Sequence, residues 1–224
     1  MKRIITINRE YGSGGYIVGQ MLAERLGYEF YDKKYLRRLS EETGFDPKYI
    51  EEHSESSPSS KSLKFIFSQQ NTSRFMEGGL SPREYLWRKQ SELIREIAQS
   101  MPCVIMGRSA DYILRDRDDV LNVFIHAPYE DRIARIERDP LYGDSDKSAK
   151  HRLKRKDESR STNYEERTGQ KWGFAENYDI CLNSSVIGLR GCVDIIEALV
   201  TGEGLTREDD EPHHEEVPEH EEEV

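Results

Sequence analysis

The chain opens with three segments whose order constrains its fold more than any other feature. Residues Ile4–Ile7 read IITI, a run of branched apolar residues typical of a buried strand. A glycine-rich turn, EYGSGGY over residues 10–16, follows, and a helical pattern then runs from Ile17 to Leu26 before Gly27 stops it. Glycines let backbone N–H groups approach an anion, and a helix N-terminus adds positive potential. Strand, turn and helix in this order therefore predict an α/β fold with a phosphate-binding loop.

The rest of the chain repeats this alternation of strand-like and helix-like segments. Short apolar runs that predict further strands are residues 28–31, 103–106, 121–125 and 178–182. Helical patterns lie between them, including one from Ser81 to Met101 that begins with Ser-Pro and Glu84, and another over Ala127–Arg138. Such alternation is typical of a parallel sheet with crossover helices. We therefore expect a three-layer α/β domain on a five-stranded parallel sheet.

Charged segments set the expected boundaries of that domain. From Glu203 onward there are eleven acidic residues and one arginine, so the net charge of −10 belongs to the tail and the remainder is neutral. A run of that composition cannot bury apolar surface, so we expect disorder there. Residues 143–171 are also highly charged and predict either a solvated helix or a lid that folds over an anionic ligand. The predicted organisation is a domain over 1–202, with a helical insertion at about 33–100 and a lid at about 143–171, followed by a disordered acidic tail over 203–224.

Composition argues against several classes of protein. Three cysteines, Cys103, Cys181 and Cys192, are far apart and form no CxxC pair, so we expect neither a disulfide framework nor a zinc site. No apolar run approaches the length that spans a bilayer, and the start of the chain lacks a signal-peptide apolar region. We expect a cytoplasmic protein with no membrane partner. The neutral body also argues against a broad nucleic-acid surface.

The glycine-rich turn departs from the common phosphate-loop pattern GxxxxGK[ST] at three positions. With Gly14 aligned on the second glycine, Arg9 stands at the first glycine, Gly15 at the lysine and Tyr16 at the Ser/Thr that ligates magnesium. Taken alone, the turn is also compatible with a tight strand-to-helix connection that holds no ligand, because glycine–serine turns are common in loops.

A nucleotide-binding turn of this kind needs a cation from elsewhere, because no lysine follows Gly14. The backbone from Tyr11 to Gly15 can hold the donor phosphates. Arg9 is the nearest cation by sequence. Its alternative role is an ion pair with Glu10 or with a helix carboxylate.

Several later segments resemble the cytidylate kinase-like family, and they follow the same order. Residues 10–15 match that family's [RE]-[FY]-G-S-G-G loop, which also lacks the lysine. The others are the helix and strand that end at Tyr31-Asp32 with Arg38 six residues later, VIMGRSAD at 104–111, the strand and helix at 124–135, KDESR at 156–160 and TGQKWG at 168–173. Ser109 stands where true cytidylate kinases have an aspartate. The resemblance covers roughly residues 1–200.

This resemblance implies a P-loop NTPase fold with a helical substrate-binding insertion and a charged lid, and it implies ATP and Mg²⁺ as cofactors. The implied phosphate-binding residues are Tyr11, Gly12, Ser13, Gly14, Gly15 and Tyr16. The candidate catalytic residues are Arg9, Arg108 and Arg160; the candidate substrate-binding residues are Asp32, Arg38, Arg108 and Asp111; and the candidate lid residues are Arg152, Arg155 and Arg160.

The candidate substrate-binding residues also have chemical arguments of their own. Asp32 can accept a hydrogen bond from a base amino group or a sugar hydroxyl, although it also suits the N-cap of a helix that begins at Lys33. Arg38 can fork to a phosphate, although it also suits a solvated helix face. Arg108 ends a strand at its carboxyl end, where ligands bind in open α/β sheets. Asp111 either holds Arg108 or helps to position substrate or magnesium.

The charged segment allows two interpretations. Arg152, Arg155, Lys156 and Arg160 lie at spacings of three, four and five, so those that share a helix face can close over phosphates and exclude water. The alternative is a solvated helix in which Asp157 and Glu158 neutralise their neighbours.

The lead hypothesis from sequence is ATP-dependent phosphorylation of a small acceptor, with a pyrimidine nucleoside monophosphate such as CMP implied by the resemblance. The rival is a nucleotide-binding regulatory or sensor protein that keeps the fold and has lost efficient transfer. The missing lysine and Ser/Thr at positions 15 and 16 support the rival. The acceptor, the metal ligands and the oligomeric state are open at this point.

Overall fold

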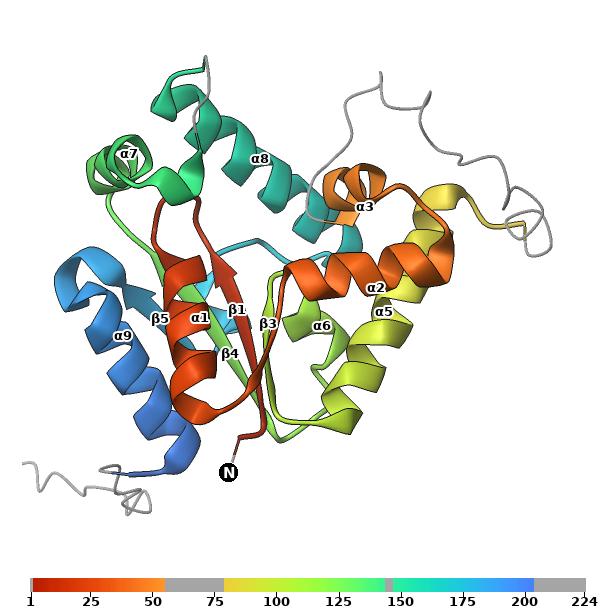
Figure 1. The fold of residues 1–224 in the computed structure, drawn as a ribbon, viewed down its shortest axis with the longest axis horizontal. Helices are drawn as coiled ribbons and strands as arrows, with labels where there is room; N and C mark the ends of the chain where they lie inside the picture. The colour runs from red at the N-terminus through yellow and green to blue at the C-terminus, as the bar shows by residue number, and fades with distance from the viewer. Residues whose placement is uncertain (1, 55–78, 144–146, 204–224) are drawn as a thin grey trace, which may run out of the picture.

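A computed structural model describes residues 2–54, 79–143 and 147–203 of the chain. Its centre is a five-stranded, wholly parallel sheet with the strand order β2-β3-β1-β4-β5 (Figure 1). The strands are β1 (Ile4–Arg9), β2 (Glu29–Tyr31), β3 (Cys103–Met106), β4 (Val120–His126) and β5 (Ile180–Asn183). The predicted α/β fold with a five-stranded parallel sheet is confirmed, and each strand lies within a few residues of its predicted place.

The central strand, β1, explains why these sequences form a parallel sheet. All six of its residues are buried, as are all four of β3, because helices cover both faces. In register, Ile4 pairs with Cys103 of β3 on one side and with Val120 of β4 on the other. After β1 the chain forms β2 and β3 on one side of that strand, and it then crosses to form β4 and β5 on the other side. The carboxyl end of β1 is therefore the switch point where open sheets bind ligands.

Two helical layers enclose the sheet. The helices are α1 (Gly15–Leu26), α2 (Lys33–Thr43), α3 (Pro47–Ser54), α5 (Pro82–Ser100), α6 (Ala110–Ile113), α7 (Tyr129–Arg138), α8 (Ala149–Thr168) and α9 (Ser184–Thr201). α1 and α9 pack on one face with Val18, Leu22 and Ile196, and α5 and α6 pack on the other with Ile94 and Ile113. Figure 1 shows α2 and α3 beside α5, and α8 crossing above the carboxyl end of β1.

Local signals place the main helix ends. Ser81 caps α5 by accepting from the Glu84 N–H, while the Glu84 carboxylate accepts from the Ser81 N–H at 2.8 Å. Gly27 ends α1 in a left-handed conformation, as its position in the sequence predicts. α5 also belongs to the core, because its buried face joins the cluster beneath β1 and β3. The predicted helical insertion is therefore helical in its described parts, but α5 also forms part of a sheet-covering layer.

The charged segment forms a real helix over most of its described length. α8 spans 20 residues, and its buried Ala149 and Leu153 pack on Ile133 and Ile136 of α7. The predicted acidic tail lies outside the described residues from 204 onward. All three cysteines are free thiols, as expected. No helix in the described ranges combines the length and apolar character needed to cross a membrane.

Candidate functional site

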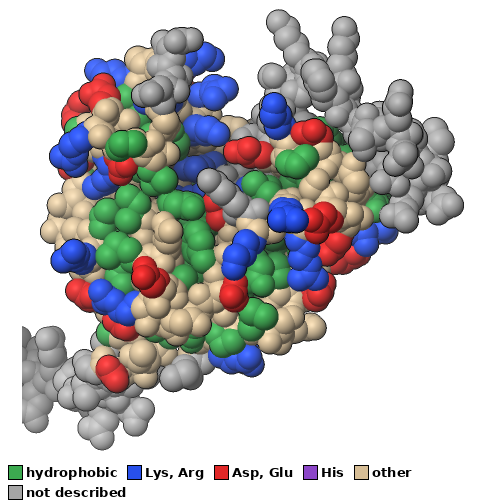
Figure 2. Space-filling view, viewed as in Figure 1, with side chains coloured by type: hydrophobic (Ala, Val, Ile, Leu, Met, Phe, Trp, Pro, Cys, Tyr) green, Lys and Arg blue, Asp and Glu red, His purple; other side chains and the backbone are tan. Residues whose placement is uncertain are grey.

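A cleft of about 580 Å³ opens at the carboxyl end of β1, between the glycine-rich loop, α2 and α3, and α8. The loop from Arg9 to Tyr16 contributes all its residues except Ser13, and Arg108 adds a residue from the end of β3. Figure 2 shows Lys and Arg side chains along the hollow on the α8 side. The sheet edge thus brings together residues that the sequence separates by about a hundred positions.

The loop backbone is held tightly from behind. Gly12 and Gly14 both adopt positive φ, at 85° and 82°, which explains why glycine occupies these two turns. Buried Ser13 turns away from the cleft: its hydroxyl donates to the Glu10 carbonyl at 2.8 Å, and its own carbonyl accepts from the Ser184 hydroxyl at 2.5 Å. The loop therefore has a fixed shape that leaves its cleft side, and the first-turn N–H groups of α1, facing an incoming ligand.

Gly14 meets the next layer of the fold. A Cβ there would lie 2.5 Å from Leu189 Cδ2 of α9. The glycine therefore serves the packing of the loop on α9 as much as the approach of an anion.

Gly15 and Arg9, the two ends of the loop, touch each other. A Cβ at Gly15 would lie 2.6 Å from Arg9 Cβ and 3.1 Å from Ile125 Cβ. The position at which the common pattern has lysine therefore has no room for a side chain while arginine occupies position 9. Arg9 is buried, with 8% of its surface exposed, and lines the cleft. The common pattern has glycine at position 9 and a cationic side chain at position 15. In this chain the cation stands at position 9 and the glycine at position 15, and the two positions are in contact.

Tyr16 closes the loop where the common pattern has Ser/Thr. Its ring lies edge-on to Phe30 of β2, with ring centroids 5.5 Å apart, and it lines the cleft. Burial is the main cause that raises the pKa of Tyr16; the charge of Asp32 also raises it, and that of Arg9 lowers it. The phenol thus lies in the field of both ends of the cleft.

Arg108 sits on a strained turn directly after β3. Gly107, Arg108 and Ser109 have φ values of 62°, 62° and 52°, and the last two are uncommon values for residues with a side chain. Buried Gln90 of α5 holds this turn, since its side-chain N–H donates to the Arg108 carbonyl at 3.0 Å. Strain of this kind marks positions that aim a side chain, and Arg108 lines the cleft while 95% buried.

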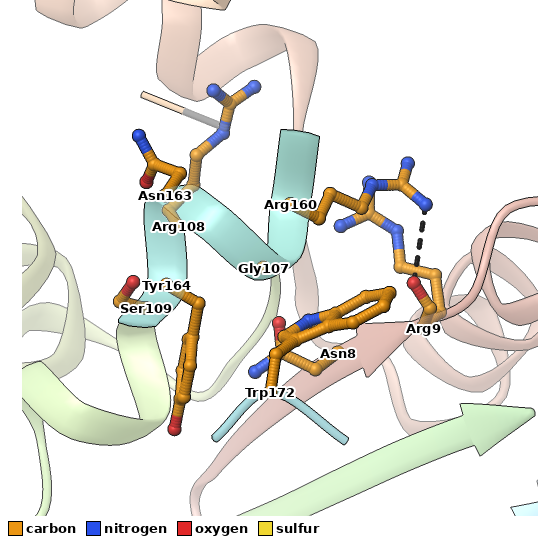
Figure 3. A pocket seen from close by; sticks show the side chains of 9 residues that line it. All are labelled: Asn8, Arg9, Gly107, Arg108, Ser109, Arg160, Asn163, Tyr164 and Trp172. Atoms are coloured by element: carbon orange, nitrogen blue, oxygen red, sulfur yellow. Dashed lines mark hydrogen bonds between the residues drawn. The ribbon is translucent and has the colours of Figure 1, made fainter. Parts of the chain in front are cut away.

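Arg160 approaches the same edge of the sheet from α8. Its guanidinium donates to the Arg9 carbonyl at 3.2 Å and lies 5.7 Å from the centre of the Tyr11 ring. A small polar cavity of about 20 Å³ adjoins the cleft, and Arg9, Arg108 and Arg160 line both spaces. Figure 3 shows Arg160 reaching toward Arg9, with Arg108 beside Asn163. Because three arginines line these adjoining spaces, an anionic ligand suits this place.

The opposite wall of the cleft carries carboxylates. Asp32, Leu36 and Glu51, from the start of α2, its second turn and α3, line this side. Asp32 occupies the N-cap position of α2, which begins at Lys33 as the sequence suggested, but its side chain makes no capping hydrogen bond. Its carboxylate belongs to the cleft.

Two candidate substrate-binding residues do not line the cleft. Arg38 pairs with Glu42 on its own helix and with Glu96 of α5, and the Glu96 hydrogen bond is the main cause that raises the pKa of Arg38. Asp111 is buried, accepting from Asn8 at 3.0 Å and from the Tyr164 hydroxyl at 2.7 Å. Arg38 thus joins two helices and Asp111 joins β1, α6 and α8.

The lid candidates divide in the same way. Arg152 donates to the carbonyls of Tyr142 and Gly143, which fixes the turn before α8, and Arg155 is exposed; neither lines the cleft. Arg160 does, together with Lys156 one turn earlier.

Two further cleft residues on this side have no role in the sequence analysis. Leu141 and Tyr142 reach the cleft from the turn between α7 and α8, and the Tyr142 ring meets the Tyr11 ring edge-on with centroids 5.2 Å apart. No local sequence pattern identifies them.

Comparison with known protein families agrees with this geometry. The sequence profile described as "Cytidylate kinase-like family" matches residues 4–186, from the start of β1 into α9. The chain belongs to the cytidylate kinase-like family.

One solved structure supports the fold at a TM-score above 0.5, and others are similar at lower scores. An uncharacterized protein from Eubacterium ventriosum shares 24% identity at a TM-score of 0.62, over 88% of this chain and 98% of that one. Shikimate kinase from Acinetobacter baumannii shares 18% identity at a TM-score of 0.49, over 91% and 96%; deoxyadenosine kinase from M. mycoides shares 15% at 0.41, over 89% and 99%. No curated protein matches the chain. Membership in this kinase-like family indicates phosphoryl transfer between a nucleotide and a small molecule.

The family also implies magnesium, and the residues of this cleft fit a weakly held ion. Tyr16 replaces the usual hydroxyl ligand, and within the described ranges no group of three His, Cys, Asp or Glu side chains could hold a metal. Magnesium in kinase sites needs only one or two carboxylates, since substrate phosphates and water complete its shell. Asp32 and Glu51 are the carboxylates on the wall of the cleft that α2 and α3 form. They fit an ion carried by the nucleotide.

Proposed function

We propose that this cleft transfers the γ-phosphoryl group of ATP to a small acceptor, a pyrimidine nucleoside monophosphate such as CMP. The observation that carries the proposal is the convergence of three arginines, Arg9, Arg108 and Arg160, with a glycine-rich loop at one end of a parallel sheet. Phosphoryl transfer requires mainly positioning and the neutralisation of charge spread over phosphate oxygens. A cationic, partly enclosed cleft supplies both.

The donor triphosphate binds along the loop. Backbone N–H groups on the cleft side of the loop, at the positive end of α1, hold its phosphates. Position 15, at the start of α1, is a glycine because a side chain there would collide with Arg9. Arg9 then supplies the charge that a lysine gives in the common pattern. Because that charge grows on the group in transit, Arg9 acts on the transition state more than on bound ATP.

The acceptor binds between α2, α3 and the end of β3. Arg108, aimed by its strained turn, forks to the acceptor phosphate. Of the two carboxylates on this wall, Asp32 accepts a hydrogen bond from an amino or hydroxyl group of the acceptor, which leaves Glu51 available to a magnesium ion. The preference for a pyrimidine monophosphate rests on the family alone. Magnesium, when bound, would supply charge that neutralises the phosphate oxygens.

Arg160 and Lys156 cover the transfer site from α8. Both side chains line the cleft beside the loop, so they add cations on the side away from the sheet and help to exclude water. Arg160 also lines the small cavity between the loop and β3, as Arg9 and Arg108 do, and this supports a role for it beside the transferring phosphoryl group.

A second candidate is a nucleotide-binding regulatory protein that transfers no phosphoryl group. The observation in its favour is the loss of both common side chains at once, since Gly15 and Tyr16 provide neither a lysine nor a magnesium-binding hydroxyl. Losing one preorganised charge-stabilising donor costs about 3 kcal/mol of transition-state stabilisation. On this hypothesis the cleft binds ATP and the arginines serve binding alone.

Turnover of ATP with magnesium, surveyed against the common nucleoside monophosphates, separates the two candidates. Nucleotide-induced shifts in melting temperature are measured in parallel. The kinase proposal predicts both a thermal shift with ATP and transfer to a pyrimidine monophosphate, and Arg108→Ala raises the KM for that acceptor. Arg37→Ala is the control, because Arg37 is exposed on α2 and pairs with Glu41 one turn along the same helix, away from the cleft. A thermal shift without transfer to any acceptor would favour the regulatory protein.

A further inference from the structure

A carboxylate from α8 rests on the phosphate loop. By sequence, Asp157 is one of many charged residues in a helical segment, yet only 17% of its side chain is exposed. One of its oxygens, Oδ1, accepts a hydrogen bond from the Tyr11 N–H at 2.7 Å. The other, Oδ2, accepts from Arg132 Nη1 at 2.5 Å. Charge-assisted bonds of this length are the stronger class of hydrogen bond in proteins. Asp157 therefore fixes α8 to the loop directly.

Arg132 of α7 ties the same point to the rest of the loop. It is buried, and besides Asp157 it donates to the Tyr11 carbonyl at 3.3 Å and lies 3.4 Å from Glu10 Oε2. Glu10 in turn accepts from the Ala127 N–H at 3.1 Å. One guanidinium of α7 thus joins two carboxylates and a loop carbonyl that come from two other segments, the loop and α8. A partly buried ionic network of this kind is stable only when its members are satisfied together.

The network reaches the cleft through Arg160. This arginine follows Asp157 by three residues on the same helix face, with its Nη1 3.9 Å from Asp157 Oδ1. It also donates to the Arg9 carbonyl and lies over the Tyr11 ring. Asp157 therefore contacts both the loop backbone and the arginine that lines the cleft.

We infer that Asp157 is a positioning residue: it latches α8 to the phosphate loop and holds Arg160 in the cleft. The inference rests on the proposed function for its catalytic consequence, but the latch itself can be tested without any substrate. Arg160 is then preorganised, and catalytic groups held in place lose less on reaching the transition state.

The neighbouring residue provides a matched control. Glu158 lies one position along α8, is exposed, and pairs only weakly with Lys154 at 3.7 Å. Removing Asp157 also leaves the apolar contact of α8 with α7, where Leu153 packs on Ile133 and Ile136. The Asp157→Ala protein is therefore expected to fold, and Asp157→Asn, which keeps the size of the side chain, is a second variant should it not.

Hydrogen exchange of the Tyr11 amide in the full-length, ligand-free protein tests the latch without any substrate. Protein labelled with ¹⁵N-tyrosine gives one signal per tyrosine, and Tyr11→Phe identifies the one in question. The latch predicts slow exchange in wild type and in Glu158→Ala, and exchange at least roughly tenfold faster in Asp157→Ala, because an amide released from its acceptor opens to water. Fast exchange in the wild-type protein overturns the inference whatever the protein catalyses.

Turnover tests the positioning of Arg160. With ATP, magnesium and the acceptor found active in the survey, Asp157→Ala is expected to lower kcat roughly 100-fold while KM for ATP changes far less, because a displaced catalytic group acts on the transferring phosphate. Asp157→Asn keeps the acceptor for the Tyr11 N–H and retains more activity; Glu158→Ala retains all of it. Unchanged kcat in folded Asp157→Ala overturns the inference while the transfer proposal stands. If the wild type transfers nothing, the proposed function fails and the amide exchange alone decides on the latch.

Discussion

The exchange of arginine and glycine between positions 9 and 15 makes a sharp prediction about stability. Lysine placed at position 15 alone would bring its Cβ 2.6 Å from Arg9 Cβ and 3.1 Å from both Arg9 Cγ and Ile125 Cβ. The first distance is closer than such atoms approach without a shift of the backbone. Overpacking of a buried site costs about 1–3 kcal/mol, so we expect Gly15→Lys to lower the free energy of unfolding by that amount.

The double variant Arg9→Gly/Gly15→Lys restores the first glycine and the lysine of the common loop pattern and removes the clash between the two positions. Two of the three close contacts belong to Arg9, and only the one with Ile125 remains. Lysine at position 15 should therefore cost much less in the Arg9→Gly background. A double-mutant cycle measured by urea denaturation is expected to show a coupling energy of about 1–2 kcal/mol, well above the ~0.5 kcal/mol scatter of independent sites. Additive effects, or a Gly15→Lys protein as stable as wild type, would refute the claim that the two positions share one space.

Two further predictions concern the residues that hold the site. Gln90→Leu leaves the Arg108 carbonyl without its buried donor, so it should lower the free energy of unfolding by about 1–3 kcal/mol and reduce turnover. Gln99→Leu, on an exposed part of the same helix, is the control and should change neither quantity. Equal effects of the two variants would contradict the role of Gln90. Burial raises the pKa of Asp111 despite its bonds to Tyr164 and Asn8. A carboxyl with a raised pKa binds more protons folded than unfolded, so its contribution makes stability fall as pH rises above about 4. Urea denaturation at about pH 5 and about pH 8 should therefore show a smaller loss of stability in Asp111→Asn than in wild type, and parallel profiles would contradict it.

The fold could be predicted from sequence because its signals are local. Runs such as IITI and CVIM are apolar on both faces, and the Ser81-Pro82 start with Glu84 forms the expected capping box. The loop and Arg108 could be placed as well, because both follow directly after a buried strand and the ends of parallel strands meet at one edge.

The remaining parts of the site depend on contacts between distant segments. Nothing near Arg38 indicates that Glu96, 58 residues away, takes its guanidinium. By sequence, Asp157 is one charge among many on α8. Its hydrogen bond to Tyr11, 146 residues away along the chain, distinguishes it from exposed Glu158. The spacing of the lid arginines was informative for Arg160 but not for Arg152, whose carbonyl partners lie in the preceding turn. Such choices are made by tertiary packing, which periodicity does not encode.

The central claim is that Arg9 supplies the charge for phosphoryl transfer in a loop without lysine. Its most direct test is the rate of γ-phosphoryl transfer from ATP to CMP with magnesium, measured for wild type, Arg9→Ala and the control Arg37→Ala. The account predicts formation of CDP by wild type and Arg37→Ala, and a kcat lower by roughly 100-fold or more in Arg9→Ala with a much smaller change in KM for ATP. Full turnover by Arg9→Ala would contradict the role of Arg9. Binding of ATP with no transfer by the wild type would contradict the proposal that the protein is a kinase.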